Sequence, residues 1–338
     1  MKWVDRTVAS PIRVLKAVRR AWASGLDRSH IRFAGIAPFV VLVVLVVAIG
    51  VPQPGFFSIA SLEALSRQAA IFVLLCGGLT LIIMTGGIDL SYASLASLVT
   101  VLLALWLPTY GAAALLFVLV LGVAAGALIG YVHAKTQVAS FIVTLGAQGV
   151  FVALALVISG ASTISVVGGY GLIAWIDGQV LGFPTVAIIA LVFTALGWSA
   201  LRWLPIGREI RAIGSAEKVA ELSGIRPTLV RVVIFGASGL CSVLGGIALV
   251  AQQQSGAPGL ADTLLLPGIA AVVIGGTAIT GGVGGLPQTI VGALILSVLR
   301  VGMGVLGINP LYDQIGYGLL LIVAIAISTD RSKIVLMK

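Results

Sequence analysis

The chain has 338 residues, of which 59% are hydrophobic and only 9% are charged, and its mean hydropathy is +1.18. Soluble domains usually carry about a quarter charged residues, so this composition excludes a disordered chain, a secreted disulfide scaffold and an ordinary soluble enzyme. We therefore expect an integral membrane protein, and we interpret the net charge of +9 as a signal of membrane orientation and not of nucleic-acid binding.

The chain begins with a basic segment, residues 1–32, that we do not expect to be a cleaved signal peptide, because the basic region is too long and no small-residue cleavage pattern follows the apolar run. We expect it on the cytoplasmic face, because membrane proteins keep Lys and Arg on that side. All but two of the 20 Lys and Arg residues then face the cytoplasm, as do both termini, including residues 330–338. The exceptions are Arg67 and Arg300. Arg300 and Asn309 are candidates for an outer mouth, and extension of the arginine into water is the alternative.

Uncharged intervals mark the expected membrane spans, because a charge is costly at the centre of a spanning helix and such a helix needs about 20 apolar residues. The sequence predicts an all-α polytopic membrane protein with about ten transmembrane helices, some of them broken, in a single domain over 33–331. The first six spans fall in 33–201 and the last four in 232–329. The uncharged intervals are 33–62, 68–88, 90–134, 137–175, 178–201, 232–261, 263–299 and 314–329.

A short internal repeat relates the two parts of the chain. An offset of 195 residues aligns Thr-Gly-Gly-Ile at 85–88 with Thr-Gly-Gly-Val at 280–283, which predicts a parallel repeat. Glycine-interrupted segments at matching places in two halves indicate a substrate path, whereas helix packing through small residues is the alternative in a chain with 43 Gly. The candidate residues for the substrate path and its gate in these two motifs are Thr85, Gly86, Gly87, Thr280, Gly281 and Gly282.

Asp89 is the most informative charge, because a carboxylate at the membrane edge is costly unless it faces a cavity, a partner or a helix end. The glycines before it and the serines after it, at positions 91, 94 and 97, predict a helix break. We expect Asp89 or Ser91 to cap the next helix, and contact with solute is the alternative. Both residues are candidates for the path and its gate.

Three polar residues, Ser140, Thr144 and Gln148, recur every four positions in an otherwise apolar span. They therefore share one face of the predicted helix. Such a stripe either lines a route for a polar solute or bonds a neighbouring helix, and the pattern favours neither alternative. Thr144 and Gln148 are kept as candidates for the path.

The stretch 202–231 is too charged to cross a membrane and is expected on the cytoplasmic side. Within it Ser215 is expected to cap a short amphipathic helix that ends at Gly224. Val219 and Leu222 share its apolar side. A short amphipathic helix at the inner face is suited to docking a soluble partner, and a solvated connector is the alternative.

Residues for catalytic chemistry are missing from the sequence. No Gly precedes any Lys, so there is no phosphate-binding loop of the Gly-Lys-Ser/Thr type. His30 and His133 lack Cys or acidic neighbours at ligand spacing, and Cys76 and Cys241 fall inside apolar spans as small buried hydrophobes. We expect no catalytic residue, no cofactor and no metal site.

Four short sequence motifs resemble those of a known family. They are TGGIDLS at 85–91, SFIVTLG at 140–146, AIG at 212–214 followed by AELSGI, and AAVVIGGT at 270–277 followed by Gly-Gly. In this order the chain resembles the permease subunits of bacterial ATP-binding cassette importers for ribose, xylose, galactose, arabinose and the furanose-like autoinducer. Branched-chain amino acid permeases belong to the same group.

The resemblance implies two permease chains, identical or related, two cytoplasmic ATPase subunits that hydrolyse the ATP, and a periplasmic or lipid-anchored solute-binding protein at a bacterial inner membrane. It implies import of a small sugar, with Phe141 as a candidate for stacking on the sugar ring. It also implies that the segment ahead of Gly224 is the coupling helix that contacts the ATPase, although Ala216 stands where the family often has Asn. The candidate coupling residues are Gly207, Ala212, Gly214, Ser215, Glu217, Ala220, Glu221, Ser223 and Gly224.

Two other transport functions remain open. A branched-chain amino acid permease is the alternative within the group. An ion-coupled secondary transporter needs ionisable residues inside the membrane, and only Asp89 and Arg300 are available for that purpose. Uptake that continues without an ATPase subunit and stops with an uncoupler would favour it.

Overall fold

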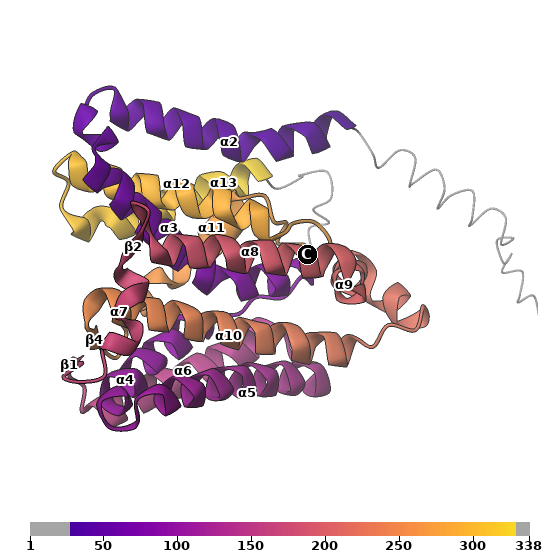
Figure 1. The fold of residues 1–338 in the computed structure, drawn as a ribbon. Coiled ribbons are helices and arrows are strands. Elements are labelled where there is room, and N and C mark those ends of the chain that lie inside the picture. Colours follow the sequence, from indigo (N-terminus) through magenta and orange to yellow (C-terminus); the bar gives the residue numbers. More distant parts are fainter. Residues whose placement is uncertain (1–27, 329–338) are drawn as a thin grey trace, which may run out of the picture. The chain divides into compact units, whose positions relative to one another are not determined.

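The computed structural model describes residues 28–328, so the predicted tails 1–32 and 330–338 lie outside the described residues except for the first positions of α2. The chain divides after Ala37 into a short N-terminal unit and a unit that begins at Pro38 and holds all later elements. Twelve α-helices lie in the described range (Figure 1). They are α2 (Arg28–Gly50), α3 (Ile59–Met84), α4 (Tyr92–Tyr110), α5 (Ala112–Thr136), α6 (Ser140–Ser159), α7 (Gly171–Asp177), α8 (Thr185–Trp203), α9 (Pro205–Leu222), α10 (Pro227–Gln253), α11 (Leu265–Ile274), α12 (Leu286–Val305) and α13 (Asp313–Ser328).

Short strands and 3₁₀ turns lie in the connections between helices. The strands form two antiparallel pairs, β1 with β4 and β2 with β3. Both pairs lie at the end of the helix bundle that is opposite α9 (Figure 1). These elements are β1 (Ile164–Ser165), β2 (Gln179–Val180), β3 (Phe183–Pro184), β4 (Ser255–Gly256), η1 (Pro54–Phe57), η2 (Asp262–Leu264) and η3 (Pro310–Tyr312).

Seven helices within residues 28–328 are long and apolar enough to cross a membrane, namely α3, α4, α5, α6, α8, α10 and α12. Three other apolar helices have 10 to 16 residues in their apolar part: α11 has 10, α13 has 16, and that of α2 covers Ile36–Gly50. The predicted all-α membrane architecture is confirmed. Ten spans were predicted, but some of the predicted spans contain only a short helix. In the span that contains α11, for example, the helix ends at Ile274 and the chain continues as irregular backbone.

The core of the bundle is formed by α3, α4 and α10. In α3, 83% of the most apolar stretch is buried, with Phe72 and Leu75 fully inaccessible, whereas only 11% is buried in α6. The helices α5, α6 and α8 lie at the periphery and expose Leu116, Val157 and Leu191. Because lipid tails are as apolar as leucine, such surfaces are stable in a membrane without further protein.

Glycines bring α5 and α10 into backbone contact. A Cβ atom added at Gly126 would lie 2.1 Å from the carbonyl oxygen of Phe235, and one added at Gly239 would lie 1.9 Å from that of Gly122. Gly122, Gly126 and Gly130 are spaced by four residues, the spacing of small residues that lets membrane helices approach closely. Larger residues here would force the two helices apart.

Buried and partly buried hydrogen bonds connect α3 and α4 to the last part of the chain. The hydroxyl oxygens of Thr80 in α3 and Thr289 in α12 lie 2.6 Å apart, and the Tyr92 hydroxyl at the start of α4 donates to the carbonyl of Leu265 in α11 (2.8 Å). Polar groups in an apolar interior need such partners. Helices from before and after the polar α9 segment therefore pack into one bundle.

Candidate functional site

The first predicted helix break is present between α3 and α4. α3 ends at Met84, and residues 85–91 run as irregular backbone before α4 begins at Tyr92. Gly86 has φ +80°, a left-handed conformation that glycine adopts without steric cost. We name residues 85–91 the first loop.

Side chains of α6 hold the first loop in place. Ser140 Oγ accepts a hydrogen bond from the N–H of Ile88 (2.9 Å), and Thr144 Oγ1 accepts one from the N–H of Leu90 (3.0 Å). Thr144 is fully buried. Of the two alternatives for the polar stripe, Ser140 and Thr144 therefore fit bonding to a neighbouring segment. Gln148 is only half-buried.

Asp89 is buried and bonded to three donors. Its Oδ1 accepts from the N–H (2.8 Å) and the hydroxyl (2.6 Å) of Ser91, and its Oδ2 accepts from the Ser238 hydroxyl in α10 (2.8 Å). Ser91 occupies the N-cap position of α4, but its hydroxyl binds Asp89 and makes no capping bond. The carboxylate therefore binds the backbone just ahead of α4 and connects the first loop to α10, a structural role like the predicted cap.

The two aligned Thr-Gly-Gly motifs lie close together, and the backbone around them contacts the backbone of α9. The N–H of Gly282 donates to the carbonyl of Met84 (2.8 Å). A Cβ added at Gly214 would lie 2.0 Å from Met84 O and 2.4 Å from Gly282 N, and one added at Gly281 would lie 2.8 Å from Gly86 N. We name Met84, Gly86, Gly214, Gly281 and Gly282 the glycine junction. It joins the first loop, the α11–α12 loop (residues 275–285) and the predicted coupling segment.

The helical segment around Gly214 begins earlier than predicted and is broken at Ala216. Ser215 does not cap a new helix: α9 begins at Pro205, a residue favoured in a first helical turn, and Ser215 Oγ donates to the carbonyl of Arg211 (2.8 Å). The backbone leaves the helical conformation at Ala216 (φ −165°, ψ 91°) and then resumes it to Leu222. The predicted short helix is therefore present over residues 217–222, after a break at Ala216 that separates it from the helical residues 205–215.

The end of α9 presents apolar side chains that no other part of residues 28–328 covers. Val219 is 62% exposed and Leu222 is 80% exposed. Beside them Lys218 donates to Glu221 Oε2 (2.8 Å), and this hydrogen bond raises the pKa of Lys218 and lowers that of Glu221. Glu217 accepts from Arg231 at the start of α10 (2.6 Å), which fixes the turn against the bundle.

The remaining predicted residues are spread over both ends of the bundle. In α9, Gly207 and Ala220 are buried against this chain. Asn309 Oδ1 accepts from the N–H of Leu311, so this residue shapes a turn. The structure leaves Thr85, Gly87, Gln148 and Ala212 half-buried, and Phe141, Thr280, Ser223 and Gly224 exposed.

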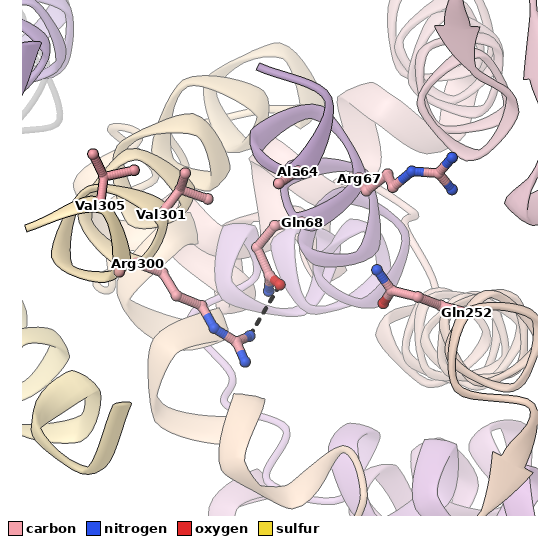
Figure 2. Close-up of a pocket in the computed structure, with 8 residues that line it drawn as sticks. Ala64, Arg67, Gln68, Gln252, Arg300, Val301 and Val305 are labelled. Atoms are coloured by element: carbon pink, nitrogen blue, oxygen red, sulfur yellow. Dashed lines mark hydrogen bonds between the residues drawn. The ribbon is translucent and has the colours of Figure 1, made fainter. Parts of the chain in front are cut away.

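At the end opposite the glycine junction lies a pocket of about 480 Å³ between α3, α10 and α12 (Figure 2). It contains Arg300, a predicted outer-mouth residue, together with Arg67, Gln68 and Gln252, which the sequence analysis did not select. The signal for Arg67 was available, since it and Arg300 are the two basic residues outside the positive-inside pattern. Nothing in the periodicity of α10 distinguished Gln252.

Comparison with known proteins gives one family and several long matches. The family model described as "Branched-chain amino acid transport system / permease component" matches residues 61–325. The ribose import permease protein RbsC of Bacillus subtilis is 34% identical over 315 residues, which cover 90% of this chain and 97% of the relative.

Two further relatives carry the names of other sugars. The fructose import permease protein FrcC of Rhizobium meliloti is 33% identical over 304 residues, 86% of this chain and 84% of the relative. The D-allose transport system permease protein AlsC of Escherichia coli is 30% identical over 300 residues, 87% of this chain and 91% of the relative. No solved structure matches the chain significantly.

Proposed function

The chain belongs to the family of branched-chain amino acid transport system permease components, as a multi-pass transport subunit and not an enzyme, and we propose that it forms the membrane pathway of an ATP-driven monosaccharide importer. The observation that carries this proposal is the similarity, along 86–90% of the chain, to permeases named for ribose, fructose and allose. The family description also names branched-chain amino acids, which are therefore the second candidate solute.

The proposed topology has ten spans with both termini on the cytoplasmic side of a bacterial inner membrane. To the seven long helices it adds α2, α13, and α11 with its following loop. A parallel repeat relates the parts before and after α9. The repeat is supported by the position of the two Thr-Gly-Gly motifs, each of which follows the end of a helix. The motifs also lie against each other, because a Cβ added at Gly281 would be 2.8 Å from Gly86 N.

In this proposal α9 transmits the movement of partner ATPases. The uncovered Val219 and Leu222 form the surface that the ATPase covers. When the ATPases close on ATP, α9 shifts, and Gly214 moves Met84 and Gly282 with it because their backbones are in direct contact. The first loop and the α11–α12 loop are the inner gate. The free energy comes from nucleotide binding and hydrolysis in the partner, and this chain supplies different contacts in two states.

The complete importer contains two permease chains, two ATPase subunits and a periplasmic or lipid-anchored solute-binding protein. Its function is tested by purifying this chain with the proteins that accompany it and reconstituting them in proteoliposomes. Uptake of labelled ribose and labelled leucine is then measured with and without ATP at the ATPase side.

We expect ATP-dependent uptake of the sugar, none without the ATPase subunit, and no effect of an uncoupler. Leucine uptake without sugar uptake would identify an amino acid permease. Uptake that needs no ATPase and is abolished by the uncoupler would indicate a secondary transporter and would contradict the proposal.

A further inference from the structure

The pocket between α3, α10 and α12 lies at the end of the bundle where an imported solute would arrive. Arg67 lines it, while Met84 at the other end of the same helix belongs to the glycine junction. At 1.5 Å per residue these two positions are about 25 Å apart. The pocket is therefore separated from the inner gate by most of a membrane thickness. The pocket is an open surface hollow of about 480 Å³, so a solute bound there would remain in contact with water.

Both arginines of the pocket are paired with carboxylates. The Arg67 guanidinium donates to Glu63 Oε1 (2.8 Å) and also binds the Asp177 carboxylate. The Arg300 Nε lies 3.6 Å from Asp313 Oδ2. Each positive charge is thus already compensated, so the site does not offer the uncompensated charge that a phosphate or carboxylate ligand requires.

The pocket nevertheless presents hydrogen-bonding groups from three helices. Arg300 Nη1 donates to Gln68 Oε1 (2.9 Å), which fixes the guanidinium and the amide side by side, and Gln252 lies exposed across from them (Figure 2). Guanidinium donors next to amide donors and acceptors match the hydroxyl groups of a polyol, each of which both donates and accepts. The side chains of Val301 and Val305 supply an apolar wall for carbon-bound hydrogens.

We propose that Gln68, Gln252 and Arg300 form an outer subsite that receives an uncharged polyhydroxyl solute before it passes toward the gate. This inference rests on the proposed function, because it takes the solute to be a sugar delivered at this end. It differs from a docking surface for the solute-binding protein, since the hydrogen bonds are made to the sugar itself.

The test compares Gln252→Ala and Arg300→Lys with the parent importer and with Gln253→Ala. Gln253 is the matched control, because it is an exposed neighbour that does not line the pocket. Ribose uptake is measured at saturating sugar-loaded binding protein, and the affinity of that binding protein for the importer is measured separately.

Loss of one hydrogen bond to the sugar should lower the uptake rate roughly threefold to tenfold in both pocket variants. The control should transport like the parent, and docking affinity should not change. Parental rates in both pocket variants, or a fall in rate matched by an equal fall in docking affinity, would overturn the subsite. A parent importer that moves no sugar at all would instead refute the proposed function.

The uncharged character of the solute is tested on the purified importer without its binding protein. Saturation-transfer NMR should detect ribose more strongly than ribose 5-phosphate at equal concentration, and Gln252→Ala should weaken the ribose signal at least threefold. A stronger signal from the phosphate, or no ribose signal from the parent, would overturn the inference.

Discussion

Gly214 is the position where a single methyl group should disconnect α9 from both loops. An alanine Cβ would lie 2.0 Å from Met84 O and 2.4 Å from Gly282 N. Ordinary carbon–oxygen contacts are about 3.3–3.6 Å, so Met84 and α9 would have to separate by more than about 1 Å. This separation would also strain the hydrogen bond from Gly282 N–H to Met84 O (2.8 Å).

The energetic terms have opposite signs. Over-packing costs about 1–3 kcal/mol and the strained hydrogen bond about 1 kcal/mol more. Alanine is favoured over glycine inside a helix by about 1 kcal/mol. The net cost at the junction is therefore about 1–3 kcal/mol, which corresponds to a factor of roughly 5 to 150 in an equilibrium between two conformations.

The assay for Gly214→Ala measures ATP-driven uptake, ATP hydrolysis and thermal unfolding of the purified importer. We expect uptake to fall at least fivefold relative to ATP hydrolysis, because the ATPases still turn over while the loops follow α9 less closely. The matched control is Gly149→Ala in α6, where an added Cβ meets nothing within 4 Å. That variant should be neutral or slightly stabilised. Equal or improved uptake and stability in Gly214→Ala, as helix propensity alone predicts, would refute the reasoning.

Three further predictions concern the first loop and the end of α9. Asp89→Ala leaves the hydroxyl of Ser238 and the groups of Ser91 without an acceptor and should destabilise the importer by about 2–4 kcal/mol in thermal unfolding, whereas Asp89→Asn should cost less; equal losses would contradict this. Thr144→Val removes the acceptor of the partly buried backbone N–H of Leu90 in the first loop and should cost about 1–3 kcal/mol and lower uptake, and parental values would show that the bond is dispensable. Leu222→Asp should reduce co-purification of the ATPase at least tenfold without changing the unfolding temperature, because the side chain is 80% exposed in this chain alone; undiminished co-purification would place the docking surface elsewhere.

The sequence was sufficient for features that depend on one helix at a time. Uncharged intervals located the long apolar helices, since each must be apolar along its own length. The breaks after α3 and α11 followed from glycines that no regular helix favours. The amphipathic end of α9 was visible because Val219 and Leu222 lie on one side of a single turn.

Features that depend on contacts between helices were not visible in the sequence. Ser140 and Thr144 share a face by periodicity, but only packing of α6 on the first loop shows which groups they bond. Gly214 resembled an ordinary helical glycine until Met84 and Gly282 were seen beside it. The short helix ahead of Gly224 was predictable, but its start lies after the break at Ala216, and the hydroxyl of Ser215, a good capping residue in isolation, instead donates to the carbonyl of Arg211.

The central claim is that separate ATPase subunits power transport through this chain, and that they do so by binding the end of α9 on the inner face of the membrane. The most direct test is labelling of Leu222→Cys with a membrane-impermeant maleimide in sealed vesicles of both orientations. Both native cysteines are buried, so the reagent reports the new thiol. We predict labelling only when the cytoplasmic face is outward, and protection when the ATPase is bound. Labelling from the opposite face, or equal labelling with and without the ATPase, would contradict the account.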